Sequence, residues 1–403
     1  MNSLKIDKID KIVRGEVKIT GSKSESNRLL ILQQFFSNLD IKNLSNSDDS
    51  RLMQKALASN SNEINIGHAG TAMRFLTSFF AIKKNSEIIL TGSHRMKNRP
   101  IKILVDALKS LGAEIEYVEK EGYPPLKITG KRLTNSSVEI DGNVSSQYIS
   151  SLLLIASSLE NGLQLKFKGE ITSVPYIKMT LQLLNEIGVE YTWIGKIITI
   201  KPKKEIEKKT IVVESDWSSA SYFYSLVALS PNSEVTLSAY KQKSLQGDSV
   251  LAKIYEKLGV KTVFKGNSII LKNIKTSNFK LLTLDLKNAP DIAQTIAVTC
   301  FGLGMECFLT GLHTLKIKET DRLVALKTEI EKLGGNVTIT NETLHLEAST
   351  KININISIVT YDDHRMAMAF APFALKVPII IEEPNVVSKS YPTFWEDFEK
   401  ITR

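Results

Sequence analysis

The feature that most restricts the fold of this chain is a junction that occurs four times. At each one, an amphipathic helical segment ends in Leu-Gly or Ile-Gly and a strand-like segment follows. The junction glycines are 76, 71 and 75 residues apart: Gly112, Gly188, Gly259 and Gly334. Because glycine commonly ends a helix, each junction predicts a helix that stops and a strand that begins. A period near 75 residues is too long for a solenoid and predicts a repeated α+β unit.

The chain has 403 residues, enough for about five to six such units and for more than one domain. We expect degenerate first and last copies, because neither terminal stretch shows the junction clearly. Helical segments alternate with short β-branched segments, which predicts an α/β architecture. The expected strands between the junctions are 87–90, 164–167, 197–200, 268–271 and 379–381. The lysine-rich segment 201–209 contains glutamates and no aromatic residue, so we interpret it as a solvated loop.

Composition and charge exclude some classes of function and leave others open. No apolar run is long enough to span a bilayer and the first residues lack an apolar core, so we expect a cytoplasmic protein without a secretory signal. Cys300 and Cys307 share one apolar segment and are expected to be buried thiols in a reducing compartment. The five histidines are scattered, which supports no metal site. The net charge of +9 suits nucleic acid or small polyanionic substrates.

Cations recur beside small residues at turns and expected helix starts. Segment 21–28 follows an expected strand at 16–20 and combines Lys23 and Arg28 with three serines. A helix N-terminus with two cations is a plausible anion cradle, although a capped helix with two solvated cations explains this segment equally well. Further clusters occur at 67–74, 94–100, 318–322, 363–365 and Lys389. Each alone is more often an ion pair or a cap, but six together favour a large anion-binding site.

Eight segments carry a resemblance to the 5-enolpyruvylshikimate-3-phosphate synthase family, and they occur in the family's order over nearly the whole chain. They are 21–28, 69–74, 95–100, 141–147, 216–223, 290–291, 318–322 and 361–368. The resemblance implies transfer of the enolpyruvyl group of phosphoenolpyruvate to the 5-hydroxyl of shikimate 3-phosphate, with release of phosphate. This reaction belongs to the shikimate pathway, which leads to chorismate and the aromatic amino acids. The resemblance also implies a monomer that needs no cofactor or metal.

The fold implied by the resemblance has two domains, each an inside-out α/β barrel of three βαβαββ units. That agrees with the period found independently in the sequence. The chain is expected to start in one domain, pass into the other and return. The first domain would contain 1–20 and 215–403, and the second 21–214, with the active site in the cleft between them.

The resemblance also assigns roles to individual residues. Phosphoenolpyruvate would be bound by Lys23, Gly70, Arg95, Gln147, Arg322, Arg365 and Lys389. Shikimate 3-phosphate would be bound by Lys23, Ser24, Arg28, Ser145, Ser146, Gln147, Ser173, Tyr176, Asp291 and Lys318. We assign Glu319 as the acid that protonates the methylene carbon and Asp291 as the base on the 5-hydroxyl. Lys23 would stabilise charge and protonate the leaving phosphate. Cations would lower the pKa of Glu319 and burial would raise it, and the sequence does not decide between them.

Several positions depart from the family's commonest pattern. His68 replaces an asparagine, Phe75 a proline, Ser215 a glycine and Trp217 a small residue. Thr314 replaces a substrate-contacting asparagine. Gly70, in place of alanine, predicts that the family inhibitor glyphosate fits the site, while Phe75 can shift the helix that begins there.

Two alternatives remain from the sequence. UDP-N-acetylglucosamine enolpyruvyl transferase shares the fold, but it usually carries a reactive cysteine in a mobile loop, unlike Cys300 and Cys307. A nucleic-acid-binding protein is suggested only by the positive charge. The Ser145-Ser146-Gln147 and 318–322 motifs favour shikimate 3-phosphate.

Overall fold

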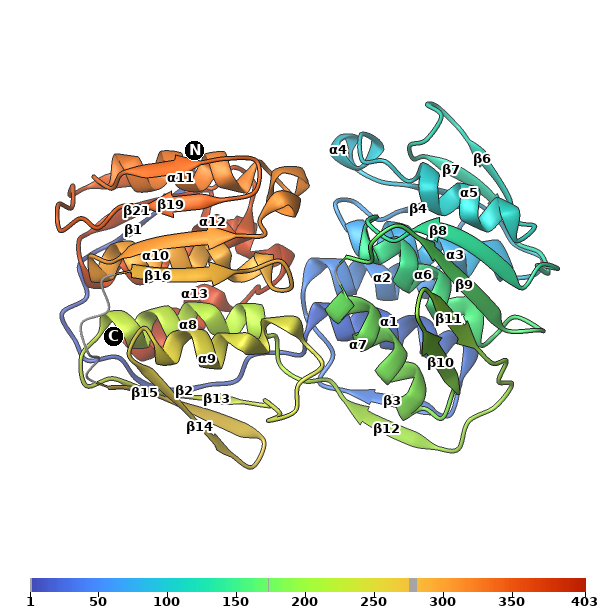
Figure 1. Ribbon diagram of the computed structural model, residues 1–403, viewed down its shortest axis with the longest axis horizontal. Coiled ribbons are helices and arrows are strands. Elements are labelled where there is room, and N and C mark those ends of the chain that lie inside the picture. Colours follow the sequence, from blue (N-terminus) through green and yellow to red (C-terminus); the bar gives the residue numbers. More distant parts are fainter. Residues whose placement is uncertain (1, 173, 275–280) are drawn as a thin grey trace. The chain divides into compact units, whose positions relative to one another are not determined.

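The computed structural model describes residues 2–172, 174–274 and 281–403. Within them the chain divides into two compact units (Figure 1). Unit 1 comprises the residues up to Thr20 together with Glu214–Arg403, and unit 2 comprises Gly21–Val213. Unit 2 is therefore inserted into the sequence of unit 1.

Unit 2 contains two complete copies of one supersecondary unit and a shorter third copy. The elements of the first copy are β4 (Glu63–Asn65), α3 (Gly70–Ile82), β5 (Glu87–Thr91), α4 (His94–Lys97), α5 (Lys102–Ser110), β6 (Glu114–Tyr117) and β7 (Leu126–Thr129). Those of the second are β8 (Ser137–Asp141), α6 (Ser146–Ala156), β9 (Leu163–Lys168), α7 (Val174–Glu186), β10 (Tyr191–Ile194) and β11 (Ile197–Ile200). Those of the third are α1 (Lys23–Phe35), β3 (Leu39–Lys42), α2 (Asp48–Ala58) and β12 (Lys209–Val212).

Unit 1 is built in the same way, with additional 3₁₀ helices. The elements of its first copy are β2 (Arg14–Val17), α8 (Trp217–Leu229), β13 (Glu234–Ser238), η1 (Gly247–Val250), α9 (Leu251–Glu256), β14 (Val260–Lys265) and β15 (Ser268–Asn273). Those of the second are β16 (Leu281–Asp285), η2 (Pro290–Ile292), α10 (Ala293–Leu303), β17 (Glu306–Thr310), η3 (His313–Ile317), α11 (Arg322–Lys332), β18 (Val337–Ile339) and β19 (Leu344–Leu346). Those of the third are β20 (Ile356–Ile358), α12 (His364–Phe370), η4 (Ala371–Leu375), β21 (Ile379–Glu382), η5 (Pro384–Lys389), α13 (Phe394–Thr402) and β1 (Ser3–Ile6).

The four complete copies share one sheet topology. In each, the first two strands are parallel, and a hairpin formed by the last two is added antiparallel to the second strand. The strand orders are β4-β5-β7-β6, β8-β9-β11-β10, β2-β13-β15-β14 and β16-β17-β19-β18. This pattern is the βαβαββ repeat, and it confirms the predicted α/β architecture.

The third copy in each unit is completed by strands from distant parts of the sequence. In unit 2, β12 pairs parallel with β3. In unit 1, β21 pairs parallel with β20 and antiparallel with β1, near the start of the chain. Among the described residues, neither copy contains the hairpin that follows the second helix elsewhere. This explains why the junction occurs only four times in the sequence.

The four junction glycines end the second helix of each complete copy. Their φ angles are +102° at Gly112, +80° at Gly188, +87° at Gly259 and +101° at Gly334. Residues with a Cβ rarely adopt these angles, so the predicted helix ends are confirmed and the need for glycine is explained.

The core of each unit consists of helices covered by sheets. In unit 1, α10 packs against α8 and α12 (Figure 1), and every residue of α8 is buried. In unit 2, α3 packs against α1 and α6. Helices that are apolar on all sides must be surrounded by other elements, which is the inside-out arrangement.

Other expectations from the sequence are met with small differences. Residues 201–208 form a loop before β12. The strand expected at 16–20 is β2 at 14–17, because its parallel register with β13 ends at Val17. Cys300 and Cys307 are free and buried, as predicted. Among the described residues, no helix combines the length and apolar character needed to cross a bilayer.

Candidate active site

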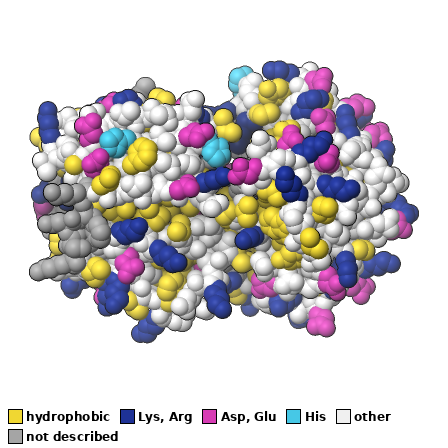
Figure 2. Space-filling view, viewed as in Figure 1, with side chains coloured by type: hydrophobic (Ala, Val, Ile, Leu, Met, Phe, Trp, Pro, Cys, Tyr) yellow, Lys and Arg dark blue, Asp and Glu magenta, His cyan; other side chains and the backbone are white. Residues whose placement is uncertain are grey.

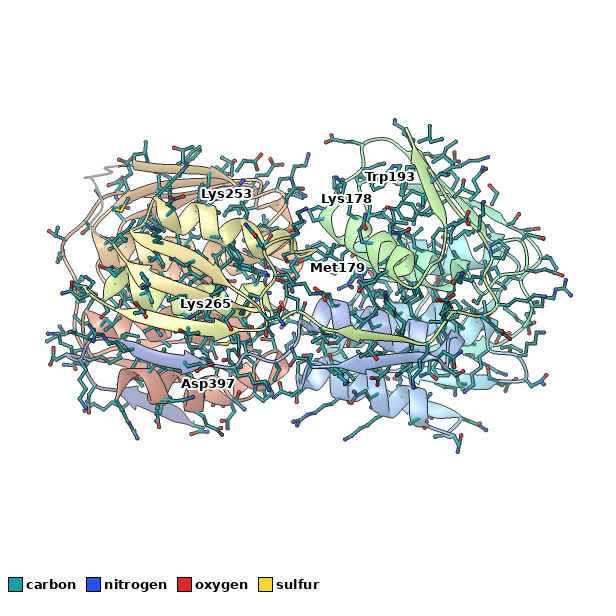
Figure 3. The ribbon with its side chains drawn as sticks, turned by 90° about the horizontal axis from the view of Figure 1, so that it is seen from below. Lys178, Met179, Trp193, Lys253, Lys265 and Asp397 are labelled. Carbon is teal, nitrogen blue, oxygen red and sulfur yellow. The ribbon has the colours of Figure 1, made fainter. Side chains whose placement is uncertain are left out.

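The first turns of several helices lie together in unit 2. Gln147 Nε2, near the start of α6, donates a hydrogen bond to Thr71 Oγ1 of α3 at 3.2 Å. Arg28 of α1 donates hydrogen bonds to Ser150 of α6 and to the Tyr176 carbonyl in the first turn of α7, the helix that carries the labelled Met179 in Figure 3. Helix N-termini carry free N–H groups and partial positive charge. This end of unit 2 therefore favours anions.

Arg28 is buried in this region of unit 2. It donates hydrogen bonds to Thr180 Oγ1 at 2.8 Å, Ser150 Oγ at 2.9 Å and the Ser24 carbonyl at 2.9 Å. Burial lowers its pKa to about 10, so the guanidinium stays charged at neutral pH. Its Cζ lies 5.4 Å from the centre of the Phe75 ring. Phe75 thus packs on a predicted substrate-binding cation, which the sequence did not indicate.

Lys23 and the predicted serines lie at helix starts. Lys23 is the first residue of α1, and its Nζ lies 3.6 Å from Asp49 Oδ2. Ser22, before it, makes no side-chain cap, whereas Ser145 caps α6 by accepting a hydrogen bond from Gln147 N. The capped-helix interpretation of the segment 21–28 is therefore weakened.

Helix α4, which contains Arg95, and the residues that follow it are held close to the start of α3. Arg74 donates hydrogen bonds to the carbonyls of Gly70 at 3.1 Å and Pro100 at 3.0 Å. A Cβ on Gly70 would lie 2.5 Å from Arg99 Nη1, so a larger residue there would displace Arg99. Arg74 and Arg99 were not predicted as site residues, although both lie in predicted motifs. Tyr176 lies in α7, and Ser173 lies outside the described residues.

In unit 1, Arg322 is the centre of a second cluster. It begins α11, which Asp321 caps by accepting hydrogen bonds from Leu323 N and Val324 N. Only 2% of the Arg322 side chain is exposed, and it pairs with three carboxylates. The shortest contacts are 2.6 Å to Asp363, 2.7 Å to Glu319 and 2.9 Å to Asp291. The Arg322 guanidinium is therefore ion-paired with carboxylates of the protein itself.

Asp291 is surrounded by cations. Besides Arg322, it lies 3.4 Å from Lys318 Nζ and 3.3 Å from Arg365 Nη2. Burial would raise the pKa of the Asp291 carboxyl, but Lys318, Arg365 and Arg322 together hold it below its usual range. Asp291 is therefore ionised at neutral pH, as a base must be.

Glu319 bridges two cations. Its carboxylate contacts Arg322 Nη2 and Lys389 Nζ, each at 2.7 Å. Burial would raise the pKa of Glu319, but Arg322 and Lys389 outweigh it and lower the pKa well below the usual range. The sequence left this balance open. In the structure, the combined effect of the cations on the pKa of Glu319 is larger than the effect of burial.

Asp363, Asp248 and Ser218 belong to this cluster but were not predicted. Asp363 caps α12 by accepting a hydrogen bond from Arg365 N at 2.8 Å. Asp248 accepts a hydrogen bond from Ser218 Oγ, and burial together with the charge of Asp291 raises its pKa to about 6. Asp363 lies in the segment 363–365 that the sequence analysis singled out, two residues before the predicted Arg365, which was an available signal. Asp248 lies in a 3₁₀ helix without a distinguishing pattern.

The chemistry of the two clusters is that of anion binding. Within the described ranges, no group of three or more His, Cys, Asp or Glu residues is placed to hold a metal ion. On the face drawn in Figure 2, Lys and Arg side chains are interspersed with Asp and Glu. That surface does not show the continuous basic stripe typical of a nucleic-acid interface.

The fold is that of the enolpyruvyl transferases. A solved EPSP synthase from Acinetobacter baumannii matches with a TM-score of 0.81 and 21% identity, over 99% of this chain and 98% of that one. The enolpyruvyl transferase NikO from Streptomyces tendae matches with a TM-score of 0.76 and 13% identity, over 99% and 97%. At these identities the likeness shows the fold alone.

The chain belongs to the EPSP synthase (3-phosphoshikimate 1-carboxyvinyltransferase) family, whose model matches residues 53–398. A 3-phosphoshikimate 1-carboxyvinyltransferase of Bacteroides fragilis strain YCH46 is 46% identical over 392 residues, which cover 96% of this chain and 95% of that protein. One from Mannheimia haemolytica is 36% identical over 428 residues, covering 97% of each. The resemblance inferred from the motifs is confirmed, and the UDP-N-acetylglucosamine alternative is not favoured.

Proposed function

We propose that this chain is a 3-phosphoshikimate 1-carboxyvinyltransferase. It transfers the enolpyruvyl group of phosphoenolpyruvate to the 5-hydroxyl of shikimate 3-phosphate and releases phosphate. The observation that carries the proposal is the match to one family over residues 53–398, which include every predicted site residue except Lys23, Ser24 and Arg28. The two cation clusters support it, because the two substrates together bring two carboxylates and two phosphates.

The residues proposed to bind substrate come from both units. Unit 2 supplies Lys23, Ser24, Arg28, Gly70, Arg95, Ser145, Ser146, Gln147, Ser173 and Tyr176. Unit 1 supplies Asp291, Lys318, Arg322, Arg365 and Lys389. We propose that both sets serve one active site, as the family resemblance implies, and that residues 1–20 with 215–403 and residues 21–214 are the two domains. We also propose a cytoplasmic monomer, and the two unpaired buried thiols support a reducing compartment.

The proposed reaction is an addition followed by an elimination. Asp291 removes the proton of the 5-hydroxyl, whose oxygen attacks C2 of phosphoenolpyruvate while Glu319 protonates the methylene carbon. In the elimination, Glu319 takes a proton back from the methyl carbon, the C–O bond to phosphate breaks, and Lys23 protonates the departing phosphate. The charged state of Asp291 supports its role as the base.

Glu319 must hold a proton when it acts as an acid. Without substrate, Arg322 and Lys389 keep it ionised. An anionic substrate bound to these cations would offset their charge, while burial would still favour the neutral carboxyl. Binding of phosphoenolpyruvate is therefore expected to raise the pKa of Glu319 toward the range that an acid needs.

The function is tested by measuring phosphate release with each acceptor. We expect release from phosphoenolpyruvate that depends on shikimate 3-phosphate and not on UDP-N-acetylglucosamine. Release with UDP-N-acetylglucosamine alone would support the alternative transferase, and release with neither acceptor would refute the proposal.

The substitution Glu319→Gln should lower kcat about 10²- to 10⁴-fold, the usual loss when an acid–base group is removed. Steady-state phosphate release measures it. Glu331→Gln, which removes an exposed ion pair with Lys327 on α11, is the control and should leave kcat unchanged. Near-normal turnover of Glu319→Gln would leave Glu319 with an ion-pairing role only.

A further inference from the structure

Glu329 is a fully buried carboxylate in unit 1 that the proposed reaction does not use. It lies in α11 and its side chain is 0% exposed. Its Oε1 accepts a hydrogen bond from Tyr361 Oη at 2.7 Å, and its Oε2 accepts one from Val359 N at 3.2 Å. Lys332 pairs with the same carboxylate. Burying a carboxylate costs free energy, and the partners of Glu329 offset that cost. These contacts therefore indicate that Glu329 has a specific structural role.

The segment held by Glu329 is the link between β20 and α12. Tyr361 and Asp362 both have φ of +54°, a left-handed conformation that is unfavourable for residues other than glycine. Two such residues in succession persist only where their surroundings fix them. The next residues are Asp363, which caps α12, and Arg365, which contacts Asp291.

The same segment is joined to α11 at a second point. Arg322 and Glu329 are seven residues apart, two turns of one helix, and therefore lie on the same face. Arg322 pairs with Asp363 at 2.6 Å, and Glu329 holds Tyr361 and Val359. A single contact would let the segment pivot on α11. Two contacts two turns apart fix both its position and its direction.

We propose that Glu329 is a positioning residue for enolpyruvyl transfer, which holds segment 359–365 against α11 and so sets Arg365 and Asp363 relative to Arg322. This inference rests on the proposed function. Glu329 itself touches no substrate in the proposal. It acts through the Tyr361 hydroxyl and the Val359 amide on cations proposed to bind phosphoenolpyruvate.

The sharpest test is Tyr361→Phe, which removes one hydroxyl and keeps the ring. We expect kcat/KM for phosphoenolpyruvate to fall about five- to tenfold, the loss that corresponds to the net contribution of one ordinary hydrogen bond. The KM for shikimate 3-phosphate should change less than twofold, because most of its proposed contacts lie in unit 2. A purely structural role would not separate the two substrates.

The matched control is Tyr224→Phe. Tyr224 is a buried tyrosine of unit 1, whereas Tyr361 is partly buried, and the Tyr224 hydroxyl is hydrogen-bonded to Thr262 Oγ1 at 2.7 Å. Its loss should leave both kinetic constants unchanged. Glu329→Gln should lower kcat/KM at least as much as Tyr361→Phe, and the double variant should be within twofold of Glu329→Gln, because both changes break the same link.

Hydrogen exchange provides a readout that does not need turnover. Amides of 359–365 should exchange faster in Tyr361→Phe than in Tyr224→Phe. If exchange there is unchanged, or if Tyr361→Phe keeps kcat/KM within twofold of the control, the positioning role is overturned. Absence of turnover in the unsubstituted protein would instead count against the proposed function, and the exchange result would still decide on the link.

Discussion

The Asp291→Asn enzyme should lose at least about 10³-fold in kcat while its KM for phosphoenolpyruvate stays within about threefold. An amide has nearly the shape of the carboxylate but cannot take the proton of the 5-hydroxyl, and losses of about 10²- to 10⁴-fold are usual for such groups. The KM is expected to change little. Lys318, Arg322 and Arg365 lose their ion pair with the Asp291 carboxylate, but all three cations remain available to bind the substrate. Steady-state phosphate release with each substrate varied in turn measures both constants.

The control for this variant is Asp285→Asn. Asp285 ends β16 in the same unit, and its Oδ1 accepts a hydrogen bond from Lys287 N at 3.0 Å. It has no proposed contact with substrate, so its kcat should match that of the unsubstituted enzyme. If Asp291→Asn retained more than a tenth of the original kcat, Asp291 would not be the base.

The substitution Arg322→Met should destabilise unit 1 by about 3–5 kcal/mol at neutral pH. Methionine fills much of the arginine volume but leaves Asp291, Glu319 and Asp363 close together without their shared cation. Buried charges that lose a partner cost far more than exposed ones. Urea unfolding followed by tryptophan fluorescence in a Trp193→Phe background reports on unit 1, which contains the other two tryptophans.

The stability loss caused by Arg322→Met should depend on pH. In the unsubstituted protein, cations hold the pKa values of Asp291 and Glu319 below their unfolded values, so these groups contribute stability above the unfolded pKa that is lost as the pH falls. Without Arg322 these pKa values rise, and protonation then relieves the repulsion among the three carboxylates. The stability difference between the two proteins should therefore narrow from pH 7 toward pH 5.

Lys272→Met is the control for charge removal in unit 1. Lys272 pairs with Glu234 at 2.8 Å across the exposed face of a sheet. Its loss should cost less than about 1 kcal/mol. A cost for Arg322→Met no larger than this would show that the three carboxylates do not depend on Arg322.

The repeat was predictable because local chemistry determines it. The glycine that ends a helix leaves a signature in four successive copies, and the structure gives all four the left-handed angle. The completion of the third copies was not predictable in this way, because β1 meets β21 and β12 meets β3 without a turn between them. Only the family resemblance predicted that the chain leaves unit 1, forms unit 2 and then returns to unit 1.

The residues of the clusters were found from motifs, but their pairing was not. Sequence order cannot show that Arg322 faces three carboxylates from three segments, or that Asp363 is one of them. The pKa of Glu319 depends on distances to Arg322 and Lys389 that only the fold provides. Asp248, with its raised pKa, has no sequence signal at all.

The insertion of unit 2 into unit 1 has a consequence for synthesis on the ribosome. All strands and helices of unit 2 have emerged once residue 213 has left the exit tunnel, so this unit can fold while the rest of the chain is still being made. Unit 1 cannot. Its strand β1 needs β20 and β21, near the other end of the chain, to complete its sheet. Strand β1 must therefore wait for almost the whole polypeptide, and a product truncated before β21 would leave it without its sheet partner, whereas β2 meets β13 much earlier.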